Sequence, residues 1–118
     1  MVQYSSPALD LSFGALADET RRGIIAHLRQ ADASITTLAA KFQMTLTGMK
    51  KHVQVLERAG LVMTRKVGRV RTCQLGTRSL AAEAAWIEDH RRLFEARFRA
   101  LDQVMQDMEQ EQGDGSPG

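Results

Sequence analysis

The hydrophobic residues in the first third of the chain recur at helical spacing and predict two short helices. Pro7 can begin the first helix, because the N–H group that proline lacks has no partner at a helix N-terminus. Asp18 is placed to cap the second helix, and its neighbour Glu19 suits the positive end of the helix dipole. Residues 31–34 are expected to form a loop. The buried stripe of the second helix is expected to comprise Ile24, Ile25 and Leu28.

The middle of the chain predicts a short helix, a tight turn at residues 43–44 and a longer helix. Thr36 or Ser34 can cap the short helix, and Thr45 can cap the longer one. Gly60 is expected to end the longer helix, since glycine commonly follows the last helical turn. The core stripe of this helix has steps of three, four and three residues and comprises Leu46, Met49, Val53 and Leu56.

The pattern changes to alternation over residues 61–75, which predicts a two-stranded hairpin that turns at Gly68 and Arg69. A two-residue loop and a four-residue loop both fit this turn. Thr77 is expected to cap a last helix over about residues 78–110, a stretch without glycine or proline. At about 1.5 Å per residue, such a helix would be on the order of 50 Å long.

Charge is distributed unevenly along a chain whose 118 residues carry a formal net charge of only +2. Residues 41–78 hold nine basic side chains and one acidic side chain, Glu57, which gives a net charge of +8. The preceding segment carries −1 and the following segment −5. Such asymmetry favours a basic segment that meets a polyanion, and a solvated basic face without a partner is the alternative.

Composition excludes several classes of protein. With 43% hydrophobic and 25% charged residues, the chain is typical of a globular protein. One cysteine forms neither an internal disulfide nor a cysteine-rich zinc site, so a reducing cytoplasm is expected. No hydrophobic run approaches the roughly 20 residues of a membrane span, and no membrane partner is expected. An enzyme is not expected either, because the cysteine and the histidines are dispersed and no phosphate loop or carboxylate pair is present.

The order of elements is the outline of a winged helix-turn-helix, a mainly α-helical fold with a two-stranded β-wing. The major groove of double-stranded DNA admits one α-helix, and the free face of the helix over residues 45–59 carries small polar residues, lysines and an amide. Phosphates would also relieve repulsion between basic residues of the hairpin. We expect DNA contacts from Thr36, Thr45, Thr47, Gly48, Lys50, Lys51, His52, Gln54, Arg65, Lys66, Arg69 and Arg71. For His52, packing is the alternative role.

Three stretches resemble signatures of the ArsR-type repressors: residues 17–28, residues 51–62, and the turn Val67-Gly68-Arg69. The resemblance implies a bacterial homodimeric repressor that binds an operator across a promoter. It also implies DNA contacts from the segment 45–52 and from the wing arginines. Lys50 departs from the family pattern, in which a small polar residue often stands at this position, so the operator sequence does not follow from the resemblance.

Many proteins of this family respond to metal ions, but their ligands are missing from the corresponding positions of this chain. The family's cysteine pair would lie on the helix over residues 35–40, which contains no cysteine. The last helix offers Asp89 and His90, whereas a metal site needs three or four ligands. We therefore expect no metal and no cofactor, and the effector stays unknown. Cys73 leaves a redox-responsive regulator as an alternative, because nearby arginines favour a thiolate.

The last helix carries hydrophobic residues at heptad spacing, which favours a seam against a second helix. A two-fold homodimer would set two recognition helices roughly 34 Å apart, on an inverted-repeat operator. The whole predicted domain spans residues 1–112, with dimerisation helices at both ends and a flexible tail over residues 113–118. The expected interface comprises Leu9, Phe13, Leu80, Ala84, Ile87, Phe94, Phe98, Leu101 and Met105. Packing of the last helix on the first helix of the same chain, and a protein-interaction module in place of a DNA-binding one, are the alternatives.

Overall fold

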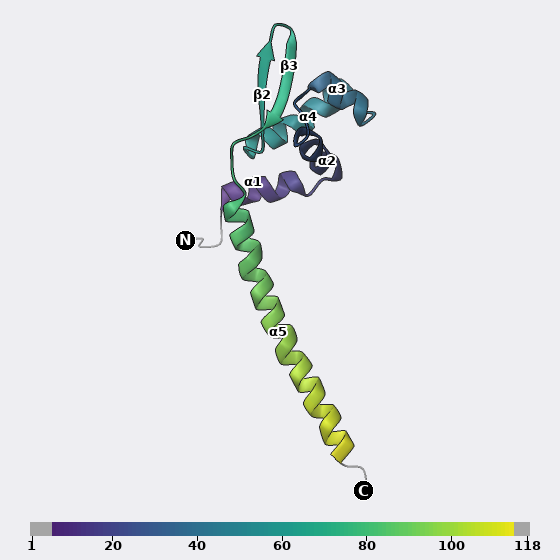
Figure 1. Cartoon of the computed structure of the whole chain (residues 1–118), viewed down its shortest axis with the longest axis vertical. Helices are drawn as coiled ribbons and strands as arrows, with labels where there is room; N and C mark the ends of the chain where they lie inside the picture. The colour runs from purple at the N-terminus through teal and green to yellow at the C-terminus, as the bar shows by residue number, and fades with distance from the viewer. Residues whose placement is uncertain (1–5, 115–118) are drawn as a thin grey trace. The chain divides into compact units, whose positions relative to one another are not determined.

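The computed structural model describes residues 6–114 and divides the chain into two compact units, residues 1–80 and residues 81–118. In the first unit, helices α2, α3 and α4 lie beside the β2–β3 hairpin (Figure 1). The second unit contains the single helix α5 (Ala81–Asp114). The elements of the first unit are α1 (Pro7–Leu16), α2 (Glu19–Leu28), β1 (Ala33–Ser34), α3 (Ile35–Lys41), α4 (Leu46–Arg58), β2 (Val62–Val67) and β3 (Val70–Leu75).

Short polar side chains begin α2, α3 and α4 as the sequence predicts. Asp18, Ser34 and Thr45 each accept a hydrogen bond at 3.0 Å from the backbone N–H three residues further on. Ser34 rather than Thr36 therefore caps α3. Gly60 follows the end of α4 with φ +75°, a conformation that favours glycine, so this predicted helix end is also confirmed.

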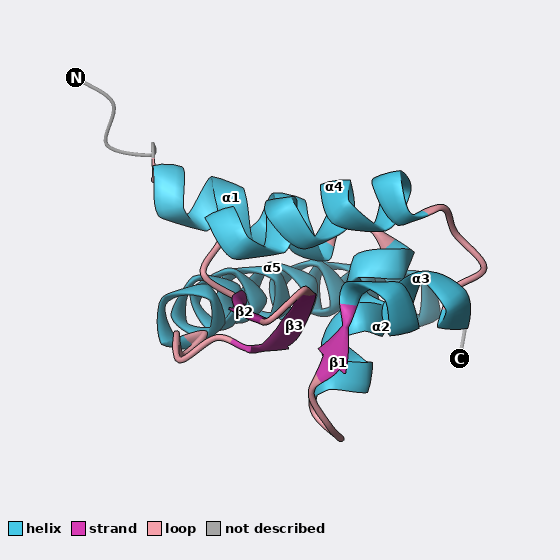
Figure 2. Cartoon of the chain, turned by 90° about the horizontal axis from the view of Figure 1, so that it is seen from above, coloured by secondary structure: helices cyan, strands magenta, loops and turns pink. Residues whose placement is uncertain are grey.

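The hairpin is part of a three-stranded antiparallel sheet in which β3 lies between β1 and β2 (Figure 2). Val67 pairs with Val70, so the turn has two residues, and Gly68 takes φ +64° at the first of them. The expectation of a loop over residues 31–34 is wrong for its last two residues, which pair with β3 as β1. A two-residue strand is too short to show an alternating pattern in the sequence.

The last helix begins and ends later than the sequence predicts. Thr77 does not cap it, because the chain stays non-helical as far as Leu80. Arg78 holds this segment by donating to the carbonyl of Ala59, at 2.7 Å, and to the hydroxyl of Ser12. At the other end the helix passes through Gly113, since one glycine costs only about 1 kcal/mol in a helix. Residues 115–118, the rest of the predicted tail, lie outside the described residues.

The core of the first unit forms around α4. Met49, Val53 and Leu56 are at most 1% exposed, which confirms three members of the predicted stripe. Leu46, the fourth, is 44% exposed, because it stands at the first turn of α4 where no other element covers it completely. Among the described residues, no helix is long and hydrophobic enough to cross a membrane.

Two arginines of α2 join that helix to α1. Arg21 donates to the carbonyls of Ala15 and Gly14, at 2.8 and 3.1 Å, and Arg22 donates to the carbonyl of Leu16 at 2.8 Å. The carbonyls at the end of a helix have no partner within the helix, so these bonds satisfy groups that would otherwise depend on water. Both side chains therefore stabilise the α1–α2 junction.

Cys73 of β3 is fully buried, between Ala33 of β1 and Thr64 of β2. Burial raises the pKa of its thiol to about 11, the negative charge of Glu57 adds to the increase, and Arg71 opposes it. Arg71 thus favours the thiolate as expected, but burial outweighs its effect on the pKa. The raised pKa disfavours the thiolate, the form on which a redox response through this residue would depend.

We expect replacement of Gly76 by alanine to destabilise the first unit by about 1–3 kcal/mol, the usual cost of overpacking. A Cβ atom at this position would lie 2.3 Å from the carbonyl oxygen of Gly60, a backbone atom that cannot rotate away. Gly14→Ala is the matched control, since nothing lies within 4 Å of its Cβ position and alanine favours a helix by about 0.5–1 kcal/mol. Urea unfolding at one protein concentration measures both effects, and equal free energies for the two variants would contradict the expectation.

We expect Cys73 to react slowly with iodoacetamide in the native protein at pH 8 and rapidly once urea unfolds the chain, because burial keeps the thiol protonated and covered. The folded pKa lies above the ordinary value of 9.0, so the contribution of this thiol to stability is complete below pH 9. It is lost as the pH rises from 9 towards 11. Native alkylation as fast as in urea would refute this.

Candidate nucleic-acid interface

Burial of one side of α4 decides which of its side chains face solvent. Because Met49 and Val53 point into the core, the residues that lie opposite on the helix are exposed. This exposed side carries two lysines, one threonine and one amide, and it has no acidic residue in its first two turns. Its members are Thr47, Lys50, Lys51 and Gln54.

The register of the hairpin separates its basic side chains onto two faces. Lys66 pairs with Arg71, and successive residues of a strand alternate between faces, so both lie on the face that carries the buried Cys73. Arg65 pairs with Thr72 on the other face. The four basic residues of the hairpin are therefore not equivalent.

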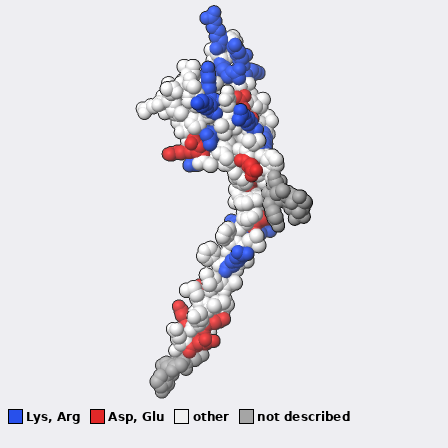
Figure 3. Space-filling model, turned by 180° about the vertical axis from the view of Figure 1, so that it is seen from behind, with Lys and Arg blue, Asp and Glu red and all other residues white. Residues whose placement is uncertain are grey.

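A groove runs between α4, the start of α3 and the hairpin. Its cationic residues are Lys50 of α4, Lys66 of β2, Arg69 of the turn and Arg71 of β3. An adjoining hollow shares Lys50 and Arg71 and adds Gln54 and Glu57. Figure 3 shows basic side chains gathered over the hairpin and the neighbouring part of the first unit. The remaining residues that line the groove are Ser34, Ile35, Thr36, Leu46 and Val70.

The structure thus brings together six of the predicted DNA-contact residues, which come from four elements and the turn: Thr36, Lys50, Gln54, Lys66, Arg69 and Arg71. Thr47 and Lys51 lie beside them on the exposed side of α4, while Arg65 lies on the other face of the hairpin. Thr45 and Gly48 stand at the N-terminus of α4, where the Thr45 hydroxyl accepts from the Gly48 N–H.

His52 differs from the other predicted contacts because it faces α2. Its Nδ1 accepts a hydrogen bond from Arg21 at 3.2 Å and lies 3.8 Å from the carboxylate of Asp18. The side chain is 19% exposed. One ring nitrogen is therefore engaged in packing, and only the other is available to a ligand.

Thr64 links α4 to the hairpin through two hydrogen bonds that the sequence analysis did not anticipate. Its hydroxyl donates to Glu57 at 2.9 Å and accepts from Nη1 of Arg71 at 3.0 Å. The sequence signal for this link was Glu57, the one acidic residue among residues 41–78. An acid in so basic a segment suggests a hydrogen-bond partner, but the sequence does not identify Thr64 as that partner.

The second unit exposes the hydrophobic seam that heptad spacing predicts on α5. Ala84 is also exposed, and Leu80 is exposed just before the helix begins. On α1, Leu9 and Phe13 are half-buried. Five large seam residues have exposed fractions between 51% and 68%: Ile87, Phe94, Phe98, Leu101 and Met105.

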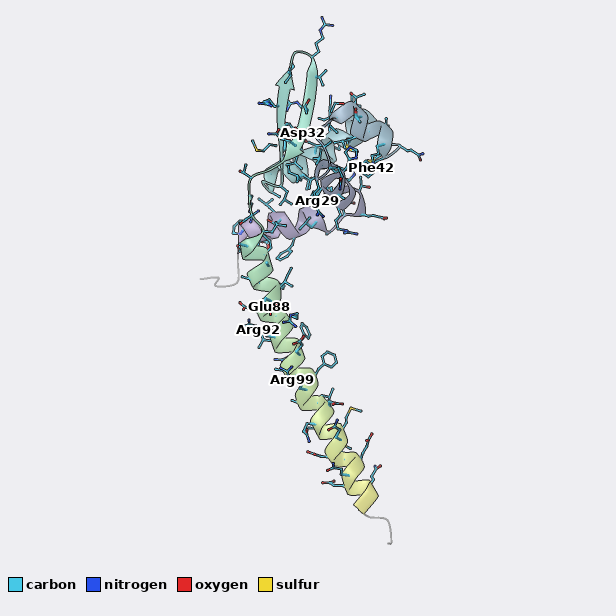
Figure 4. The ribbon with its side chains drawn as sticks, viewed as in Figure 1. Arg29, Asp32, Phe42, Glu88, Arg92 and Arg99 are labelled. Atoms are coloured by element: carbon cyan, nitrogen blue, oxygen red, sulfur yellow. The ribbon has the colours of Figure 1, made fainter. Side chains whose placement is uncertain are left out.

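Arg91, which lies between the seam residues Ile87 and Phe94, forms ion pairs within α5. Arg91 donates to Glu88 at 2.7 Å and also pairs with Glu95. Arg92 donates to Glu88 at 3.2 Å, and Figure 4 labels these two residues. The hydrogen bond from Arg91 is the main reason that the pKa of Glu88 falls to about 2. Charge on this part of α5 is therefore largely compensated within the helix.

The histidine of α5 is engaged within the helix. The ring of His90 stacks on Trp86 with a centroid separation of 3.8 Å, and its Nδ1 donates to the carbonyl of Trp86 at 2.9 Å. Asp89, the other expected candidate ligand, is exposed. Over residues 6–114, no group of three or more His, Cys, Asp or Glu side chains is arranged to hold a metal ion.

Known proteins share both the sequence and the fold of this chain. Residues 16–65 match the helix-turn-helix domain family. The HTH-type transcriptional regulator Rv2034 of Mycobacterium tuberculosis is 37% identical over 82 residues, which are 70% of this chain and 75% of that protein. The crystal structure of an ArsR family transcriptional regulator superimposes with a TM-score of 0.69 and 39% identity, over 80% of this chain and 97% of that one.

An ArsR-like transcriptional regulator from Rhodococcus sp. RHA1 gives a TM-score of 0.64 with 32% identity, over 82% of this chain and 92% of that chain. These relatives are transcriptional regulators rather than enzymes. The fold here is a helix-turn-helix, formed by α3 and α4, followed by a β-hairpin wing. The chain therefore belongs to the ArsR family of DNA-binding transcriptional regulators, with a winged helix-turn-helix fold.

Proposed function

We propose that the chain acts in the cytoplasm as a homodimeric repressor, which binds an inverted-repeat operator and so blocks a promoter. One observation carries the proposed mode of DNA binding: Lys50, Lys66, Arg69 and Arg71 line one groove between α4 and the wing. Four cations around a groove attract a phosphate backbone, while the exposed side of the adjoining helix can enter the major groove.

In this proposal α4 recognises bases. Lys50 lines the groove, and Gln54, one helical turn further along α4, lines the adjoining hollow. Thr47 and Lys51 extend the same exposed side. A lysine suits the acceptor atoms of guanine, and an amide suits adenine. Gly48 adds no side chain at the start of α4, which leaves room for close approach to DNA.

Phosphate contacts in the proposal come from the helix N-termini and the wing. Thr36 and Thr45 stand at the starts of α3 and α4, where backbone N–H groups favour anions. Lys66, Arg69 and Arg71 contact the phosphates beside the major groove. The remaining two predicted contacts are peripheral ones: His52 through its second ring nitrogen, and Arg65 from the other face of the wing.

The exposed seam of α5 supports the homodimer. A monomer with five large hydrophobic side chains more than half exposed along one helix would present an apolar surface to water, and a second copy can cover it. We propose an interface that includes both predicted dimerisation helices and makes residues 1–112 one functional module. The interface residues are Leu9, Phe13, Leu80, Ala84, Ile87, Phe94, Phe98, Leu101 and Met105.

The proposed repressor lacks the metal sites usual in the family, and its effector stays unknown. The engagement of His90 with Trp86 supports this, because the ring stacks on the indole and its Nδ1 donates to the carbonyl of Trp86. To test repression, a DNA fragment selected by the protein from a random-sequence pool is placed across a promoter that drives a reporter. Expression should fall when the protein is produced, and the selected fragments should contain inverted repeats. Direct repeats or unchanged expression would contradict the proposal.

We expect Lys50→Gln to weaken binding to the selected fragment and to reduce discrimination at one operator position, because the proposal assigns Lys50 to a base. Loss of its positive charge should also reduce the slope of log K against log salt, by up to about 0.9, the value per neutralised phosphate. Arg29→Gln is the control, because Arg29 is exposed on the C-terminal side of α2 and does not line the groove (Figure 4). Equal salt slopes and affinities for the two variants would contradict the assigned role of Lys50.

We expect Phe98→Glu to shift the protein from dimer towards monomer, because it places a charge in the middle of the proposed hydrophobic seam. The loss should be visible by sedimentation velocity at micromolar concentration, and DNA affinity should fall with it. Ala96→Glu adds the same side chain on the opposite side of α5 and should leave the dimer intact. A Phe98→Glu variant that sediments as the wild type would refute the assigned seam.

A further inference from the structure

We propose that Glu57 and Thr64 are positioning residues, which hold the guanidinium of Arg71 in the groove where DNA binds. This inference rests on the proposed contact between Arg71 and DNA. Glu57 is an unexpected residue in a segment of net charge +8, since its carboxylate repels phosphates. A role in fixing a neighbouring cation explains why an acid stands there.

The two hydrogen bonds of Thr64 have a defined direction. A guanidinium only donates and a carboxylate only accepts, whereas a hydroxyl has one proton and two lone pairs. The Thr64 proton therefore points to Glu57, at 2.9 Å, and a lone pair receives Nη1 of Arg71, at 3.0 Å. Each bond involves one charged group, and such bonds are stronger than those between neutral groups.

Glu57 and Thr64 each lie next to a fully buried residue. Glu57 lies on the last turns of α4, directly after the fully buried Leu56. Thr64 pairs with Cys73, which is fully buried, while Arg71 lies diagonally across the ladder on the same face of the hairpin. The bonds thus join the recognition helix to the wing beside buried residues of both elements.

Holding Arg71 has a direct benefit for binding. A long side chain that is already restrained loses less rotamer freedom when it contacts a phosphate. The bond to Thr64 uses one N–H of a guanidinium that has five, so the others remain available to DNA. Lys50 lines the same groove, which means that the restrained arginine is presented beside the recognition helix.

Five variants, one of them a double substitution, test this inference on the selected DNA fragment. We expect Thr64→Val, which keeps the shape of the side chain but removes the hydroxyl, to weaken binding roughly two- to tenfold, as for one lost hydrogen bond. Thr64→Ser should restore wild-type affinity, and Glu57→Gln should weaken binding even though it removes a negative charge. In an Arg71→Ala background, Thr64→Val should cause no further loss, since its effect acts through Arg71.

The outcomes separate this inference from the proposed function. If Arg71→Ala binds as the wild type, the proposed contact of Arg71 is wrong and the inference falls with it. If Arg71→Ala weakens binding while Thr64→Val and Glu57→Gln do not, the contact stands and the positioning role is overturned. An equal loss from Thr64→Val with and without Arg71 would also overturn it, because a general structural defect acts in both backgrounds. Thermal unfolding of each variant identifies any loss of folded protein.

Discussion

The burial of Met49, Val53 and Leu56 fixes the rotation of α4 about its own axis, and the rest of the interface depends on that rotation. Successive residues of a helix differ by about 100°, so a shift of one position would turn Lys50 towards the core. The buried stripe thus specifies which polar side chains reach solvent. A packing constraint in the interior therefore determines the chemistry that the helix presents outside.

The sheet imposes the same kind of constraint on the wing. Val62 and Cys73 are buried on one face of the hairpin, and the strand period of two then assigns every other side chain to a face. Lys66 and Arg71 lie on the groove side as a result, and Arg65 on the other. Helix rotation and strand register together place cations from separate parts of the chain around one groove.

The sequence predicts those features whose signals are local. Thr45 and Gly60 bound α4 through contacts within a few residues, and the turn at Gly68 needs only its own backbone conformation. Other features depend on partners that are distant in the chain and have no sequence pattern. Arg78 bonds to a carbonyl 19 residues away, and β1 exists only because β3 lies beside it. For the same reason, Glu57 could be noticed in the sequence, but its link to the wing could not.

The burial of Cys73 has a practical consequence for spectroscopy. It is the one cysteine of the chain, and its protonated thiol is enclosed by the sheet and the helices. A second cysteine introduced at an exposed position, such as the wing tip, would therefore be the far more reactive of the two. Fluorescent or spin labels could thus be attached to the wing without first removing the native cysteine.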